Sequence, residues 1–112
     1  MITYTSEDVI NTAAADLGRY VPGEALGAAE HATLSNALDR VIAEVSKIIA
    51  INDRDEIPAI AFECICVLTA MFASSMFSNV PYDKIRVEQV EQRLRYLIAQ
   101  TPTYETLPVL YF

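Results

Sequence analysis

One stretch constrains the fold of this chain more than any other: IPAIAFECICVLTAMFASSMF, at residues 57–77. Sixteen of its 21 residues are hydrophobic. As a helix it is long enough to cross a bilayer, which takes about 20 apolar residues. It is therefore either a membrane span or the central helix of a small soluble protein, and most of the functional interpretation depends on which.

The two faces of this predicted helix differ, which favours burial within protein. Bulky residues share one face: Ile60, Cys64, Ile65, Leu68, Met71, Phe72 and Met76. The other face is small and carries the only charge: Ala59, Glu63, Cys66, Ala70, Ala73 and Ser74. A helix in lipid is expected to be bulky nearly all round, and a lone carboxylate is costly in hydrocarbon. The flanking segments supply neither a basic cluster nor an aromatic belt, so we expect a buried central helix and no membrane partner.

Two partners are conceivable for the small face. The positions Cys66, Ala70 and Ser74 recur every fourth residue, a spacing that lets helices approach closely in membranes and in soluble bundles alike. If the face meets a neighbouring subunit, the interface candidates are Ala59, Glu63, Cys66, Ala70 and Ser74. Alternatively, the alanine-rich first helix covers this face within the monomer. The residues favour neither arrangement over the other.

Two helices are predicted before the apolar stretch. The first follows Thr5 or Ser6, since Thr5 and Asp8 have the spacing of a capping box and Gly18 is a natural stop. Residues 19–33, with three helix breakers, are predicted to be a linker. A long amphipathic helix then covers residues 34–49, where apolar side chains recur at helical spacing.

The chain after the apolar stretch is predicted to form one more helix and an arm. That helix runs from about Pro81 or Asp83 to Gln100, and Glu91 with Arg95 has the spacing of a stabilising ion pair. Two prolines keep the remainder, TPTYETLPVLYF, out of a long helix. The predicted fold class is therefore all-α: a small bundle of about four helices over residues 1–100 and an extended C-terminal arm over residues 101–112.

The arm ends in apolar and aromatic side chains, which are costly to expose unless they dock on a partner. We therefore predict that it is a docking segment. Its candidate contact residues are Tyr104, Leu107, Val109, Leu110, Tyr111 and Phe112. The alternative is a tail that folds back on its own bundle.

The residues that could carry chemistry form no catalytic pattern. The only histidine, His31, falls in the predicted linker, far in sequence from any activated nucleophile. On a helix Cys64 and Cys66 point about 200° apart, so they cannot bridge each other, and neither has a histidine nearby to complete a metal site. Three glycines leave little scope for a phosphate loop. We therefore predict no enzymatic activity, no cofactor and no metal.

The charge balance is acidic and uneven. The chain has 15 acidic and 8 basic residues, for a net charge of −7. Residues 1–80 hold 11 of the acids and 4 of the bases, whereas residues 81–112 hold 4 of each. This balance argues against adhesion to nucleic-acid backbones or anionic lipid surfaces. The last third of the chain is the better candidate for meeting an acidic partner.

The order of these features resembles a known family. A short capped helix ends in AAADLG, a linker follows, and a long helix contains LSNALDRVIAEVSKIIA. The dipeptide IP then opens the very apolar helix, and an amphipathic helix and an extended tail complete the chain. This order, over roughly residues 3–98, is similar to the head–tail adaptor (connector, or head-completion) proteins of tailed bacteriophages. It is closest to the podoviral tail-accessory group that stabilises packaged DNA, although the C-terminal region is shorter here.

The resemblance implies a structural role in the virion. A helical-bundle subunit would assemble as a twelvefold homo-oligomeric ring beneath the portal protein, and its tail would grip the portal or an adjacent subunit. A tail or nozzle protein would lie below the ring, and DNA would pass through without sequence-specific binding. The protein would be made in the host cytoplasm and end at the head–tail junction. Two alternatives from other classes are a holin-like membrane protein spanning at residues 57–77 and a soluble helical regulator that binds one protein partner.

Overall fold

The computed structural model describes residues 2–18, 27–78 and 81–100. This part of the chain forms four helices: α1 (Ser6–Asp16), α2 (Ala28–Val45), α3 (Ala59–Ser78) and α4 (Lys84–Gln100). Two short strands, β1 (Thr3–Tyr4) and β2 (Ile57–Pro58), pair antiparallel. The prediction of an all-α bundle of four helices is confirmed. The predicted arm, residues 101–112, lies outside the described residues.

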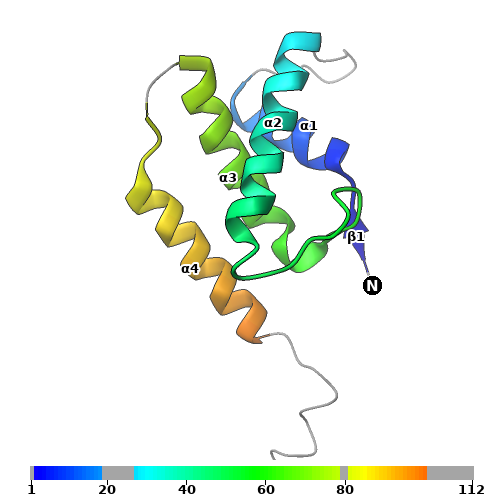
Figure 1. Cartoon of the computed structure of the whole chain (residues 1–112), viewed down its shortest axis with the longest axis vertical. Coiled ribbons are helices and arrows are strands. Elements are labelled where there is room, and N and C mark those ends of the chain that lie inside the picture. The colour runs from blue at the N-terminus through cyan, green and yellow to red at the C-terminus, as the bar shows by residue number, and fades with distance from the viewer. Residues whose placement is uncertain (1, 19–26, 79–80, 101–112) are drawn as a thin grey trace, which may run out of the picture.

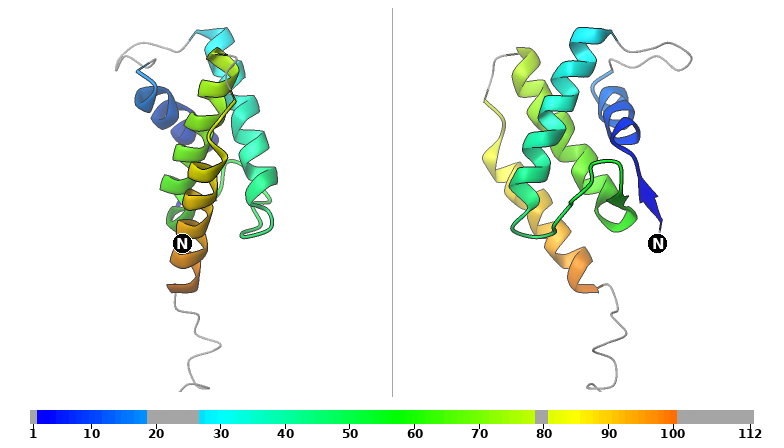
Figure 2. Two further views of the ribbon diagram at one scale, coloured as in Figure 1. Left: turned by 90° about the vertical axis from the view of Figure 1, so that its left-hand side faces the viewer. Right: turned by 45° about the vertical axis from the view of Figure 1, so that its right-hand side comes forward.

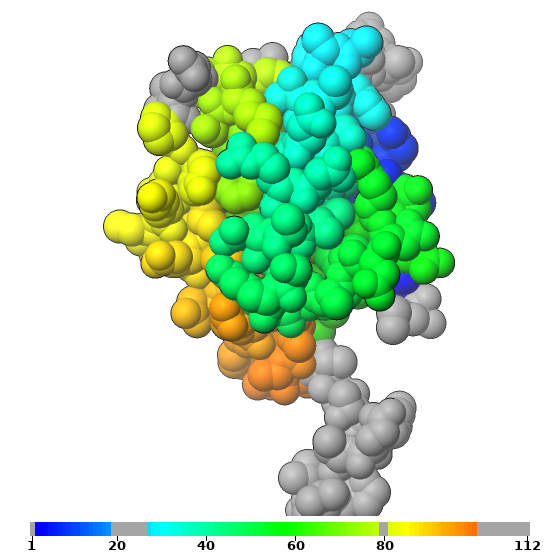
Figure 3. Space-filling model, in the orientation of Figure 1, coloured from blue at the N-terminus to red at the C-terminus, as the bar shows by residue number. Residues whose placement is uncertain are grey.

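The central element of the bundle is α3. The other three helices all pack against it, and α1 also packs against α2. In Figure 1, α1 and α4 lie on different sides of α3, while α2 crosses one of its faces, and the turned views in Figure 2 agree. Figure 3 shows that α2 and the chain after it cover that face of the molecule, with α4 along one edge. Among the helices of the described residues, none lies over the opposite face of α3.

The first helix begins and ends where the sequence predicts. The Thr5 hydroxyl oxygen accepts from the Asp8 backbone N–H at 3.3 Å, and the Asp8 carboxylate accepts from the Thr5 N–H at 3.0 Å. This reciprocal pair is the predicted capping box, and it satisfies two backbone donors that the helix itself cannot. Gly18 follows the helix with φ +71°, a conformation that glycine adopts without strain.

The predicted start of α2 is wrong by several residues. The helix begins at Ala28 with Gly27 as its N-cap, whereas residues 19–33 were expected to be linker. Residues 28–33 form the additional part of the helix, and they include three alanines and a glutamate, both good helix formers. His31 therefore lies on α2 rather than in a linker, and its Nε2 lies 2.7 Å from Glu7 Oε1 of α1. At the other end α2 stops at Val45, four residues before the expected end.

A small sheet joins the start of the chain to the start of α3. Thr3 pairs with Pro58 and Tyr4 with Ile57. The rings of Tyr4 and Phe62 stack with their centroids 4.0 Å apart. Pro58, expected in the first turn of the helix, lies one residue before it, where its missing N–H costs no helical hydrogen bond. The pair fixes the entry of α1 beside the first turn of α3.

The core fills the space around α3. Its fully buried large side chains come from every helix: Ile10, Leu34, Leu38, Ile65, Leu68 and Leu94 are among them. In the described residues, α3 is also the one helix long and apolar enough to span a membrane, and half of its most apolar window is buried inside the molecule. Its bulky face is thus largely covered by the rest of the chain.

The predicted pair of Glu91 and Arg95 is replaced by a longer-range contact. The Glu91 side chain turns inward and is only 6% exposed. Its Oε2 lies 3.3 Å from Nζ of Lys47, in the turn after α2, although no aligned hydrogen bond forms. Lys47 also pairs at 3.0 Å with Glu44, three residues before it. Glu91 therefore ties α4 to the end of α2.

Asp55, in the loop before β2, accepts two hydrogen bonds from the first residue of α1. The Asp55 carboxylate accepts from the Ser6 backbone N–H at 3.1 Å and from the Ser6 hydroxyl at 2.6 Å. The hydroxyl bond first, and then the backbone bond, lower the pKa of Asp55 below its ordinary value of 3.8. Both bonds favour the charged carboxylate.

We expect Asp55→Asn to lower the free energy of unfolding at pH 7. The difference in this free energy between the variant and the parent chain should become smaller below pH 3.8. The folded pKa is the lower one, so the stabilising contribution is present above the unfolded pKa and is lost as pH falls through the folded pKa. Urea unfolding across a pH series measures it. The exposed neighbour Glu56 provides the control, Glu56→Gln. A gap between Asp55→Asn and the parent that is constant with pH would contradict the account.

Candidate functional site

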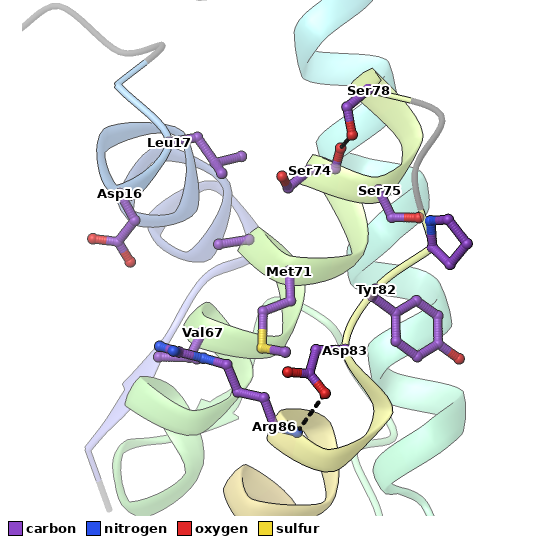
Figure 4. A pocket seen from close by; sticks show the side chains of 12 residues that line it. Asp16, Leu17, Val67, Met71, Ser74, Ser75, Ser78, Tyr82, Asp83 and Arg86 are labelled. Atoms are coloured by element: carbon purple, nitrogen blue, oxygen red, sulfur yellow. Dashed lines mark hydrogen bonds between the residues drawn. The ribbon is translucent and has the colours of Figure 1, made fainter.

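A groove runs along the face of α3 that no helix covers. Two adjoining hollows form it, with volumes of ≈ 590 and ≈ 390 Å³, and both are lined by Asp16 and Val67. Figure 4 looks into the larger hollow: α3 is the floor, the end of α1 is one wall, the start of α4 is the other, and α2 lies behind. The groove is thus a direct consequence of three helices packing around one.

The larger hollow has a small-residue floor and mixed walls. From α3 it takes Val67, Ala70, Met71, Ser74, Ser75 and Ser78. On the α4 side, Figure 4 shows the Arg86 side chain extending across the groove toward Val67. Tyr82 turns away and packs against Phe72, with ring centroids 4.7 Å apart. The Asp83 carboxylate accepts from the backbone N–H of Ile85 and of Arg86 and so caps α4.

The smaller hollow is acidic at its edge and apolar below. Its lining residues are Thr12, Asp16, Phe62, Glu63, Cys66 and Val67. Asp16 comes from α1, which has three acidic residues and no basic one. Glu63 is the one charged residue of α3 and is exposed. This hollow therefore suits an apolar or aromatic group with a positive charge beside it.

The predicted small face of α3 is divided between this groove and the core. Cys66 and Ala70 are only 2% and 8% exposed, because α1 packs over that side. Glu63 and Ser74 remain exposed in the groove, and Ala59 is exposed at the start of α3. Of the five interface candidates, three are thus open to a partner and two are covered by the chain's own first helix.

The cysteines lie in the core and are chemically quiet. Both are free and buried. Burial raises the pKa of the Cys66 thiol to about 12, and burial likewise raises that of Cys64. Since the thiolate is the reactive form, neither is poised as a nucleophile. Within residues 2–18, 27–78 and 81–100, no group of acidic, cysteine or histidine side chains has the geometry to hold a metal ion.

A second surface, which the sequence analysis missed, lies on the outside of α4. Ile85 and Tyr96 are 68% and 64% exposed, and with Ile2 they are the exposed large apolar residues of the described chain. Helical spacing puts them on one face, opposite buried Val87 and Leu94. Gln89 and Gln92 lie between them on this face and Ala99 and Gln100 lie beside them, while the exposed Glu88 stands at one edge of the face. The 4–3–4 spacing from Ile85 to Tyr96 was the available signal, but the interleaved charges of α4 obscured it.

The predicted docking arm lies outside the described residues, with all its candidate contact residues: Tyr104, Leu107, Val109, Leu110, Tyr111 and Phe112.

No protein-family model, curated protein or solved structure matches this chain.

Proposed function

We propose that this chain is a non-enzymatic head–tail adaptor of a tailed bacteriophage. It assembles as a ring beneath the portal, extends the DNA channel and links the head to the tail. The observation that carries the proposal is a small bundle with two separate contact surfaces, the groove along α3 and the outer stripe of α4. A subunit whose two complementary surfaces face different directions adds copies head to tail, and such a contact closes into a ring when its rotation allows.

The chain's charge supports the same role. A net charge of −7 repels the DNA backbone, so a lumen built from this protein lets DNA slide through without binding it. The resemblance in element order supplies the partners: the portal protein above, a tail or nozzle protein below, and further copies of the chain around a twelvefold ring. Assembly in the host cytoplasm and a final location at the head–tail junction follow from that role in tail assembly and DNA packaging.

The membrane alternative has one observation in its favour, the 20-residue apolar helix α3. A holin-like protein would turn that helix to lipid. Against it, α1, α2 and α4 all pack on α3, and its one charged side chain, Glu63, is exposed. A soluble regulator that binds one protein partner would need only one of the two surfaces.

We expect the full chain to stay in the supernatant after high-speed centrifugation without detergent, because α1, α2 and α4 cover most of the bulky face of its apolar helix. Fractionation of expressing cells, followed by detection of the chain in each fraction, measures this. A known holin expressed in parallel provides the control for the membrane fraction. Recovery of the chain in the membrane fraction alone would overturn the adaptor proposal and support the alternative.

A further inference from the structure

We propose that the outer stripe of α4 docks in the groove of a second copy of this chain, with Tyr96 seated in the hollow edged by Asp16 and Glu63. Ile85 then seats in the larger hollow, over Met71 and Ser74. This contact rests on the proposed ring, since it names the surfaces that would join one subunit to the next.

The donor side of the contact has the composition of an interface centre. Its two large apolar residues, Ile85 and Tyr96, stand on one face with Gln89 and Gln92, and the flanks of that face carry Glu88, Arg93 and Arg95. Interface centres are poor in charged residues and rich in tyrosine, and arginine is common beside them. An isolated exposed apolar residue is ordinary, but two on one face of a helix indicate a contact surface.

The acceptor side is shaped to receive a helix. Its floor runs along α3 from Phe62 to Ser78, which is about 24 Å of helix at 1.5 Å per residue. The two donor side chains are eleven residues apart, or about 16 Å, so one helix face can reach both hollows. The floor of the larger hollow includes the small side chains of Ser74, Ser75 and Ser78, and small residues let two helix backbones approach closely.

Charge complementarity selects a second copy as the occupant. Four of the eight basic residues of the chain lie on α4, against two of its fifteen acidic residues, and one of those two is the inward-facing Glu91. The smaller hollow is edged by Asp16 and Glu63, on two elements that contain no basic residue, whereas Arg86 lines the larger hollow. Seating Tyr96 there brings the exposed Arg95 toward these carboxylates. The protein thus carries both halves of a complementary pair on its own surface.

The two halves lie on different parts of the molecule, which determines the type of assembly. The groove lies between α1 and α4 over α3 (Figure 4). The stripe lies on the exposed side of α4, opposite the buried Val87 and Leu94. A donor of one copy therefore fills the acceptor of the next, and a pair of copies keeps one free donor and one free acceptor. Such a heterologous contact produces rings or filaments rather than isolated two-fold dimers.

The contact can be tested by disulfide trapping between separately purified variants. Gln92→Cys and Asp16→Cys place one thiol on each half and keep Tyr96, while the native cysteines stay buried and protonated. Mixing the two variants under mild oxidation is expected to give a covalent dimer. Mixing Gln92→Cys with Glu44→Cys, an exposed position on α2, provides the matched control. A yield no greater than that of the control would overturn the proposal.

Charge exchange gives an independent measurement on the uncrosslinked chain. We expect Glu63→Arg and Arg95→Glu each to weaken self-association, the double variant to restore it, and Tyr96→Ala to weaken it by about thirtyfold. Analytical ultracentrifugation reads the association, and thermal unfolding verifies that each variant folds. Failure of the double variant to recover would contradict the contact.

The outcomes separate this contact from the function on which it rests. If Tyr96→Ala still forms normal rings on the portal, the proposed contact is wrong and the proposed adaptor role stands. If trapped dimers form but the chain does not bind the portal, the contact stands and the adaptor role is wrong.

Discussion

Replacing Leu68 by alanine is expected to lower the free energy of unfolding by about 2–5 kcal/mol, the usual cost of emptying a leucine site in a packed core. Leu68 is fully buried on α3, the helix against which the other three pack. A domain of this size has a total stability of about 5–15 kcal/mol, so the loss is a large share of it. Urea unfolding should show a lower midpoint with an unchanged slope.

The matched control for this substitution is Ile85→Ala. It removes a side chain of similar size from α4, where 68% of that side chain is exposed. Its effect on the stability of the isolated chain should stay within about 0.5 kcal/mol. Equal losses from the two substitutions would contradict the assignment of α3 as the centre of the core.

Deleting residues 103–112 is expected to abolish stable attachment to the portal and to leave the thermal unfolding of the isolated chain almost unchanged. In the described part of the chain, the buried core is formed by residues between Val9 and Leu94. The removed segment ends in Leu110, Tyr111 and Phe112, side chains suited to filling apolar pockets or accompanying an added strand. Parallel melting curves and a pull-down on immobilised portal measure the two effects.

Thr103→Ala provides the control for the deletion, because it changes the arm at a polar position and keeps its apolar end. Backbone amide exchange on the isolated full chain tests the competing arrangement. Protection of residues 109–112 before any partner is added would mean that the arm belongs to its own bundle, and the docking proposal would fail.

Local patterns in the sequence predicted the helices well because helices depend on near neighbours. The capping box of Thr5 and Asp8 and the stop at Gly18 both need only contacts within a few residues, and both are present. The start of α2 was mistaken because Gly27 was treated as a breaker within a linker, whereas it is the N-cap of the helix. A glycine is compatible with either role, and the alanines after it decide the outcome.

Contacts between distant residues could not be predicted from one sequence. The β1–β2 pair consists of two residues on each side and shows no alternation that would mark a strand. Glu91 has a partner at the right helical spacing in Arg95, yet it pairs with Lys47, because the packing of α4 turns it inward. The spacing of charged residues along one helix does not predict which charged residues of other elements pack against it.

The sequence predicted only part of the candidate site, for the same reason. The helical wheel of residues 57–77 identified a small face bearing Glu63, and that face does supply the groove floor. Which part of it α1 would cover depended on the packing of the bundle, so Cys66 and Ala70 could not be separated in advance from Ser74. The stripe from Ile85 to Tyr96 could have been found from its spacing, because its period is a property of the sequence.

The mass of the complex between the full chain and its portal tests the central claim most directly. Size-exclusion chromatography with light scattering, followed by electron microscopy of the peak, gives the number of copies and their arrangement. The account predicts a discrete complex in which the chain forms a closed, twelvefold ring on one end of the portal. A full-length chain that elutes free of the portal, or that binds it without forming a ring, would contradict the account.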